Sequence, residues 1–134
     1  MAETREIQRV LFVDTDQNSR ALAKMGLEGI KEWKLELAGT AAEALVKAAY
    51  LQPDLIVMDL TVPGMDVAST MEQLRKNSHL SNVPVIFTGK NASAGEIQKF
   101  KKLGAAGYIA KPFDTMTLSD DIEAIVLQFR ERRR

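Results

Sequence analysis

Polar side chains stand directly after four short apolar runs of this 134-residue chain. An Asp in such a place is often only a turn residue or a helix cap. Four such positions in one chain are harder to explain in that way, so we take these residues as candidate members of one site. They comprise three carboxylates, one hydroxyl and one ammonium group, carried by Asp14, Asp16, Asp59, Thr88 and Lys111.

Clustered carboxylates repel one another, so a cation is needed to offset their charge. Mg²⁺ suits this role, because it prefers oxygen ligands and keeps several waters. Lys111 would add a second positive charge and Thr88 a hydroxyl donor. Together these groups could bind a phosphoryl group. A carboxylate, already ionised at pH 7, could attack its phosphorus and form an acyl phosphate.

Five segments have the pattern of β-strands that would position these residues. Four are continuous apolar runs rich in β-branched or aromatic residues, namely residues 10–13, 55–58, 83–87 and 108–110. Runs of this kind are typical of strands buried on both faces of a parallel sheet. The fifth segment, residues 33–37, alternates apolar with charged residues, which indicates an edge strand with one wet face.

Helical patterns separate these strands. Thr40 with Glu43, and Ser93 with Glu96, have the spacing of capping boxes, and the first box predicts a helix to about residue 50. The last helix is expected to begin at about Thr115. Apolar stripes predict the buried residues of the first, third and last helices as Leu22, Met25 and Ile30, then Met71 and Leu74, then Leu118, Ile122, Ile125, Val126 and Phe129.

Five strands alternating with five helices predict an α/β fold with a parallel sheet covered on both faces. An edge-like strand in second place favours the flavodoxin-like doubly wound order 2-1-3-4-5. Binding sites in such sheets form outside the carboxyl ends of the strands. The fold therefore brings the polar residues of the strand ends to one edge.

Length and composition agree with one ordinary globular domain, with 46% hydrophobic and 27% charged residues. The chain has no cysteine, and no segment resembles a signal peptide or a membrane span, so we expect a cytoplasmic protein. Lys+Arg and Asp+Glu both number 18, which gives no sign of direct nucleic-acid binding. Four of the 18 basic residues lie in the final RERRR, as a solvated helix end or a linker.

The strings VLFVD, PDLIVMDLTVPGMD, VPVIFTG and GAAGYIAKPF occur in the order and spacing of a known family. On these strings the chain resembles the receiver domain of two-component response regulators. The resemblance implies a lead-in over residues 1–8, a receiver domain over residues 9–130 and a basic tail or linker over residues 131–134.

The resemblance implies a role for each matching residue. Asp59 would be the phosphoacceptor, and Mg²⁺ would be held by Asp14, Asp59 and the backbone carbonyl of Thr61. Thr88 would be the switch threonine, whose hydroxyl turns toward the phosphoryl group. Tyr108 would swing inward in response. Lys111 would pair with the phosphate, and its bond to Pro112 would be cis.

The resemblance also implies partners. A sensor histidine kinase or a phosphotransfer protein would supply the phosphoryl group. The face formed by the fourth helix, fifth strand and fifth helix would pass the signal to a downstream protein or a fused output domain, and a homodimer is compatible with this. The domain would be a phosphoacceptor that transfers and releases its own phosphoryl group, and not an enzyme in the usual sense.

Thr15 is the main departure from the family pattern, which has a second acidic residue there. A hydroxyl is a poor substitute for a carboxylate, so the Mg²⁺ affinity is expected to be reduced. One alternative is therefore a pseudo-receiver, a protein-binding module with little phosphorylation. A remoter alternative is a haloacid-dehalogenase-like phosphatase, with Asp14 as nucleophile and Asp16 as acid/base. A nucleotide or flavin site does not fit, because the loop after the first strand is acidic and lacks glycines.

Overall fold

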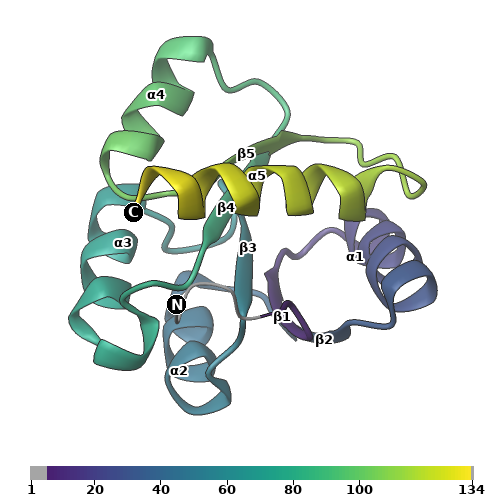
Figure 1. The fold of residues 1–134 in the computed structure, drawn as a ribbon, viewed down its shortest axis with the longest axis horizontal. Coiled ribbons are helices and arrows are strands. Elements are labelled where there is room, and N and C mark those ends of the chain that lie inside the picture. Colours follow the sequence, from purple (N-terminus) through teal and green to yellow (C-terminus); the bar gives the residue numbers. More distant parts are fainter. Residues whose placement is uncertain (1–5, 134) are drawn as a thin grey trace.

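The structure is a computed structural model that describes residues 6–133. Residues 1–5 of the expected lead-in and Arg134 of the expected tail lie outside this range. Five strands form one parallel sheet in the order β2-β1-β3-β4-β5, which confirms the predicted flavodoxin-like topology (Figure 1). The strands are β1 Arg9–Val13, β2 Lys34–Ala38, β3 Leu55–Asp59, β4 Val85–Gly89 and β5 Gly107–Ala110.

Helices connect successive strands and cover both faces of the sheet. Helices α1 and α5 pack on one face, and α2, α3 and α4 lie on the other (Figure 1). The helical segments are α1 Gln17–Ala23, its π-helical continuation η2 Lys24–Gly29, α2 Ala41–Leu51, α3 Val67–Lys76, the short η3 Ser78–Leu80, α4 Ala94–Lys102 and α5 Leu118–Arg132. The expected domain boundary at residue 130 falls inside α5. No helix within residues 6–133 is long and apolar enough to cross a membrane.

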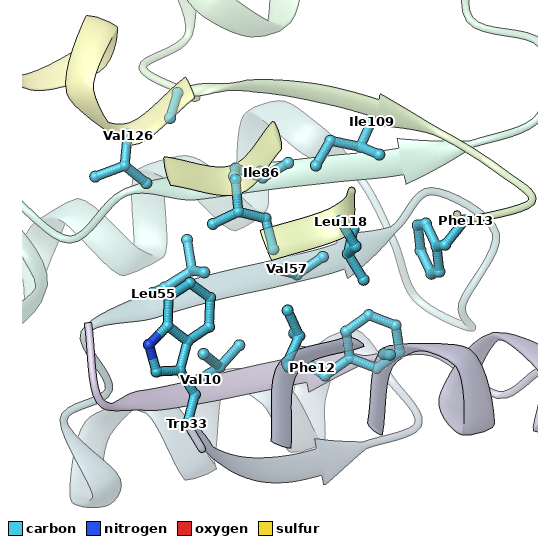
Figure 2. Close-up of a cluster of buried hydrophobic side chains, with 14 of the residues drawn as sticks. Val10, Phe12, Trp33, Leu55, Val57, Ile86, Ile109, Phe113, Leu118 and Val126 are labelled. Atoms are coloured by element: carbon cyan, nitrogen blue, oxygen red, sulfur yellow. The ribbon is translucent and has the colours of Figure 1, made fainter. Parts of the chain in front are cut away.

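Two apolar layers hold the sheet between its helices. Figure 2 shows the layer beneath α5, where Val10, Leu55 and Ile86 of three adjacent strands meet Val126 of the helix. Trp33 belongs to this layer, with only 7% of its surface exposed. It lies just before β2, so the edge strand begins one residue later than predicted. The predicted buried stripe of α5 is confirmed except at Ile125, which is only partly buried, and Met71 and Leu74 of α3 are buried as predicted.

The predicted buried stripe of the first helix is wrong beyond Leu22. Met25 and Ile30 are 60% and 46% exposed, and Gly26 and Leu27 are buried in their place. The cause is the π-helical segment η2, since one extra residue in a helical turn rotates all later side chains around the axis.

A glycine makes this turn fit against α5. A Cβ on Gly26 would lie 3.1 Å from the carbonyl oxygen of Thr115 and 3.5 Å from Leu118. A contact of 3.1 Å is tighter than most Cβ contacts in proteins, so a side chain here would require Thr115 or the helix to shift by a few tenths of an ångström.

Local hydrogen bonds set where the other helices begin. Ser93 and Glu96 form the complete predicted capping box of α4. Thr40 caps α2, but Glu43 accepts from the N–H of Gly39 instead of that of Thr40, so the predicted box is only half formed. Helix α5 begins three residues later than predicted, because Asp114 takes the N–H groups of residues 116–118 in a turn.

Two strands extend further toward the carboxyl edge than predicted. Strand β3 includes Asp59, and β4 runs over residues 85–89 instead of 83–87, so Thr88 lies inside the strand. Asp59 and Thr88 are direct neighbours in the β3–β4 register. The ladder therefore fixes the backbone of both candidate site residues.

Candidate functional site

Two buried carboxylates and one ammonium group meet at the carboxyl edge of the sheet. Lys111 Nζ lies 2.9 Å from Asp14 Oδ2 and 3.3 Å from Asp59 Oδ1. The three side chains are 6%, 1% and 4% exposed, respectively. A charge-assisted contact of this kind in a water-poor site is much stronger than a surface ion pair.

Three different strands bring these groups together. Asp14 directly follows β1, and its N–H donates to the carbonyl of Ala38 at the end of β2. Asp59 is the last residue of β3. Lys111 follows β5, and its N–H donates to Gly89 O at 2.8 Å. Its peptide bond to Pro112 is cis, as the family resemblance implied.

Backbone and side-chain donors hold the remaining carboxylate oxygens. Asp14 Oδ1 accepts from the N–H of Asp16 at 2.8 Å. Asp59 Oδ2 accepts from the N–H of Thr61 at 3.2 Å and also from the Thr61 hydroxyl. Both carboxylates are thus oriented by hydrogen bonds. Asp59 Oδ2 accepts two of them, whereas Asp59 Oδ1 and the two oxygens of Asp14 each accept one and keep a second lone pair for a further ligand.

The protonation state of Lys111 follows from two opposing effects. Burial lowers the pKa of Lys111, because it disfavours the charged form. The hydrogen bond and negative charge of Asp14, with those of Asp59, outweigh burial and raise the pKa above its ordinary value. Lys111 is therefore a permanent cation of the site at neutral pH.

Thr88 carries a buried hydroxyl that has no hydrogen-bond partner within residues 6–133. Its side chain is fully buried, next to Asp59 in the sheet. An unpaired buried polar group costs about 1–3 kcal/mol. Its position in the site indicates that a ligand oxygen could serve as the missing partner.

Tyr108 lies on the neighbouring strand β5 and is half-buried. Its hydroxyl accepts from the N–H of Ala92 at 3.4 Å, in the loop between β4 and α4. The same hydroxyl would lie 3.2 Å from a Cβ on Gly89. Because Gly89 has no side chain, the Tyr108 ring has room to pack against this loop.

The third carboxylate, Asp16, lines the same cleft, but Lys111 forms its ion pairs with Asp14 and Asp59 only. Asp16 is exposed and caps α1, with Oδ2 accepting from Ser19 Oγ at 2.9 Å and Oδ1 from the N–H of Asn18. The Ser19 hydrogen bond is the main cause that lowers the pKa of Asp16. Only two carboxylates meet, and no group of three or more Asp, Glu, His or Cys side chains in the described part of the chain is placed to hold a metal.

An open cleft of about 520 Å³ lies over the buried pair of carboxylates. Thr15, Thr61 and the loop of residues 89–92 form its rim. The donor set suits Mg²⁺, which proteins usually bind through one or two carboxylates together with waters and phosphate oxygens. Asp14 and Asp59 supply the carboxylates, and Thr61, whose backbone carbonyl is the third expected ligand, lines the same cleft.

Arg20 is a neighbour of the site that no sequence motif indicated. Its Nε donates to the Asp14 carbonyl oxygen at 2.5 Å, and Nη2 donates to Ala38 O at 3.3 Å. A lone arginine on an amphipathic helix has no pattern that separates it from a solvated surface residue. Only the fold places it behind Asp14.

The parallel 2-1-3-4-5 sheet and the acidic site at its carboxyl edge define a flavodoxin-like α/β domain. The family model of the response regulator receiver domain matches residues 10–123. The chain therefore belongs to the response regulator receiver domains of two-component signalling. Receiver domains are signalling domains and not classical enzymes, generally bind Mg²⁺ and interact with histidine kinases.

Curated relatives and solved structures agree with this assignment. Response regulator Rre1 of Synechocystis is 27% identical over 124 residues, covering 92% of this chain and 52% of that protein. Protein-glutamate methylesterase/protein-glutamine glutaminase 2 of Koribacter versatilis is 32% identical, covering 91% of this chain and 34% of that protein. The chain thus spans about half or less of these relatives. The chemotaxis response regulator CheY4 of Vibrio cholerae has a TM-score of 0.80 at 27% identity, covering 90% and 99% of the two chains.

Proposed function

We propose that this domain accepts a phosphoryl group on Asp59 from the phosphohistidine of a sensor histidine kinase or a phosphotransfer protein. The observation that carries the proposal is the arrangement around Asp59. Lys111 holds one oxygen of this buried carboxylate, an open cleft lies above it, and the unpaired Thr88 hydroxyl lies beside it. We further propose that the domain extends over residues 9–130.

The proposed reaction is a displacement at phosphorus. An Asp59 oxygen attacks the phosphorus, a new P–O bond forms, and the P–N bond to the histidine breaks so that the imidazole leaves. Asp59 needs no separate base, because its carboxylate is ionised at neutral pH. The ammonium group of Lys111 would balance negative charge on the transferring oxygens, as positive groups do in phosphoryl transfer.

Asp14, Asp59 and the Thr61 carbonyl would hold Mg²⁺, whose charge neutralises phosphoryl oxygens when it is bound. Thr15 supplies no carboxylate, and Asp16 is committed to the cap of α1. We therefore expect weaker Mg²⁺ binding than a site with a second carboxylate at this position would have.

The switch would begin at Thr88. Its hydroxyl has no hydrogen-bond partner within residues 6–133 and would bond a phosphoryl oxygen. Tyr108 would then exchange its hydrogen bond with Ala92 for a new position, which changes the α4-β5-α5 face. A downstream protein or a fused output domain would recognise the changed face.

Two other functions compete with this proposal. A pseudo-receiver is favoured by one observation, the missing carboxylate at Thr15, and would bind partners without phosphorylation. The phosphatase alternative would need Asp16 as acid/base, but its carboxylate caps α1 instead. Membership of the receiver family also argues against that alternative.

The test combines acetyl phosphate, Mg²⁺ and intact-mass measurement. The wild type should gain one phosphoryl group, Asp59→Asn should gain none, and Asp120→Asn, a matched change at an exposed position of α5, should behave like wild type. A wild type that stays unmodified at high Mg²⁺ would support the pseudo-receiver. Steady phosphatase turnover lost in Asp14→Asn but kept in Asp59→Asn would support the enzyme.

A further inference from the structure

Five basic residues surround the loops at the amino ends of β4 and β5, at the edge of the sheet opposite Asp59. We call this group the basic edge. It comes from the ends of α3, α4 and α5 and consists of Arg75, Lys101, Lys102, Arg132 and Arg133.

The three arginines converge on one pair of loops. Arg75 donates to Leu80 O at 2.7 Å, to Val83 O at 2.9 Å and to Gly104 O at 3.1 Å. Arg132 donates to Ala106 O at 3.3 Å. Arg133 donates to Asn82 Oδ1 at 2.7 Å and to Ser81 O at 3.3 Å. Lys101 and Lys102 lie in the last turn of α4, just before Gly104 in the chain.

None of these five side chains forms an ion pair within residues 6–133. The arginines bond only neutral carbonyl and amide oxygens, so their charge is not offset locally. Burial, and next to it the charge of Arg133, lower the pKa of Arg75 to about 10. Arg75 is still charged at pH 7, and it lies close enough to Arg133 to be repelled by it.

The helix dipole explains each cation taken singly, because a cation in the last turn is stabilised by the carbonyl end of its helix. It does not explain why three helix ends bring uncompensated charges to the same place. Ion pairs such as Lys31 with Glu123 and Lys47 with Glu43 occur elsewhere on the surface, and so do lysines such as Lys24 that have no ion pair among the described residues. What distinguishes the basic edge is that its three arginines converge on one pair of loops. The basic edge therefore has unused capacity to bind an anionic partner.

A cavity of about 160 Å³ adjoins the basic edge between η3, the start of β4 and the end of α5. Ser78, His79, Asn82 and Arg133 give it hydrogen-bonding walls. Asp54 also lines it, but its Oδ2 accepts the backbone N–H groups of Gln8 and Arg9. The cavity is of a size to receive one polar side chain.

We propose that the basic edge and this cavity bind an acidic segment of a partner protein, separately from the phosphoacceptor site. A long nucleic acid is the less suitable partner, because the remaining surface carries enough acidic residues to bring the whole chain to zero net charge. Within the described residues, Tyr50 of α2 is the only aromatic among the large exposed apolar side chains. The exposed ring beside the basic edge is that of His79, whereas a run of stacked bases needs several rings.

The test uses ¹H–¹⁵N NMR titration of the ¹⁵N-labelled chain with a poly-glutamate peptide. Amide signals of residues 81–83 and 104–106 should shift, and binding should weaken as salt is raised. Arg132→Glu/Arg133→Glu should bind roughly tenfold more weakly, as expected for the loss of two charge-assisted contacts. The matched control is Lys24→Glu/Lys34→Glu, which makes the same change of charge at exposed positions elsewhere and should bind with little loss.

Further variants keep the test decisive. Lys101→Glu/Lys102→Glu removes charge where no side-chain hydrogen bond is lost, and it serves if the arginine variant unfolds. Asp59→Asn should bind the peptide as wild type does. The proposal is wrong if the peptide does not bind at low salt, if the matched control loses as much affinity, or if single- or double-stranded DNA binds the same residues more tightly than the peptide.

Discussion

Lys111 neutralises two buried carboxylates at once, so the stability of the site depends on this side chain. In Lys111→Met, Asp14 and Asp59 would face each other unpaired. Removing one partner from a buried ion pair typically costs about 3–5 kcal/mol. We expect a loss of that order at pH 7, with partial recovery when Mg²⁺ is added. Urea unfolding of both proteins with and without Mg²⁺ measures this, and equal stability in its absence would contradict it.

The raised pKa of Lys111 also sets a pH dependence. A group whose pKa is higher in the folded state stabilises the fold below its unfolded value, about 10.4 for lysine. That contribution disappears as the pH rises through the higher folded value. Wild type should therefore lose stability above about pH 10.4 more steeply than Lys111→Met. Parallel unfolding slopes for the two proteins in this range would argue against the assigned ion pair.

Arg20 lies close enough to Thr15 to compete with Mg²⁺ for a carboxylate introduced at position 15. The side chains of Thr15 and Arg20 both lie next to Gly39. A Cβ on Gly39 would be 3.6 Å from Thr15 Cγ2 and 3.5 Å from Arg20 Nη2. An aspartate at position 15 would therefore come within reach of Arg20. We expect Thr15→Asp to strengthen Mg²⁺ binding, and Thr15→Asp/Arg20→Gln to strengthen it further. NMR titration with Mg²⁺ measures both, with Arg20→Gln alone as control, and equal affinities of the single and double variants would refute the competition.

Position in the sheet was enough to predict Asp14, Asp59, Thr88 and Lys111 as neighbours, because parallel strands end at a common edge. The capping role of Asp16 could not be predicted in the same way. It depends on which of several hydrogen bonds a short side chain makes, and helix caps and metal ligands use the same residue types. The hydroxyl contact of Thr61 with Asp59 is of the same local kind.

At the scale of elements, the π-helical turn determines how the first helix packs. Gly26→Leu should destabilise the fold by about 1–3 kcal/mol, because its side chain would overlap Thr115 O and Leu118. Gly29→Leu is the matched control. A Cβ there has no atom within 4 Å, so it should be neutral or slightly stabilising. Urea midpoints compare the two, and similar effects of both changes would contradict the close contact.

Helix α4 is the least firmly held helix of the fold, since none of its residues is buried. Its Phe100 ring lies 5.7 Å from that of Phe87 and is its main aromatic anchor. Amides of α4 should exchange hydrogen faster than those of α5, and Phe100→Ala should widen the difference. Hydrogen–deuterium exchange resolved by peptide measures this. Equal protection of α4 and α5 would mean that α4 is more tightly packed than its exposure indicates.

Apolar periodicity predicted α5 and the buried strands, because their stripes face a core on one side. Apolar periodicity gave the wrong buried face at η2, because one extra residue in the turn rotates the later side chains around the helix axis without any change in amino-acid composition. The start of α5 was also missed, since Asp114 can form a turn or a first helical turn with the same sequence. Such choices depend on the neighbouring element, here the contact of Gly26 with Thr115.

At the scale of the whole molecule, the topology was predictable because alternating strands and helices leave few arrangements of a parallel sheet. The grouping of cations at the opposite edge of the sheet was not. Net charge is zero, yet the carboxyl edge of the sheet carries buried carboxylates, and the opposite edge carries the uncompensated cations of the basic edge. The carboxylates were predicted to lie together because each follows a predicted strand, whereas the cations of the basic edge come from the ends of three helices, where no strand-end pattern marks them.

The unpaired hydroxyl of Thr88 means that the resting fold is not the most stable one this backbone can hold. Valine has nearly the same shape, favours strands and has no polar atom to leave unpaired. Thr88→Val should therefore have a higher urea midpoint than wild type, with a free energy of unfolding larger by about 1 kcal/mol. Its NMR spectrum should change less than that of wild type when beryllofluoride is added. A less stable Thr88→Val would mean that the hydroxyl already has a partner. If Thr88→Val is more stable, as expected, the hydroxyl of Thr88 lowers the stability of the domain without a bound phosphoryl group. The same hydroxyl would stabilise the proposed phosphorylated form.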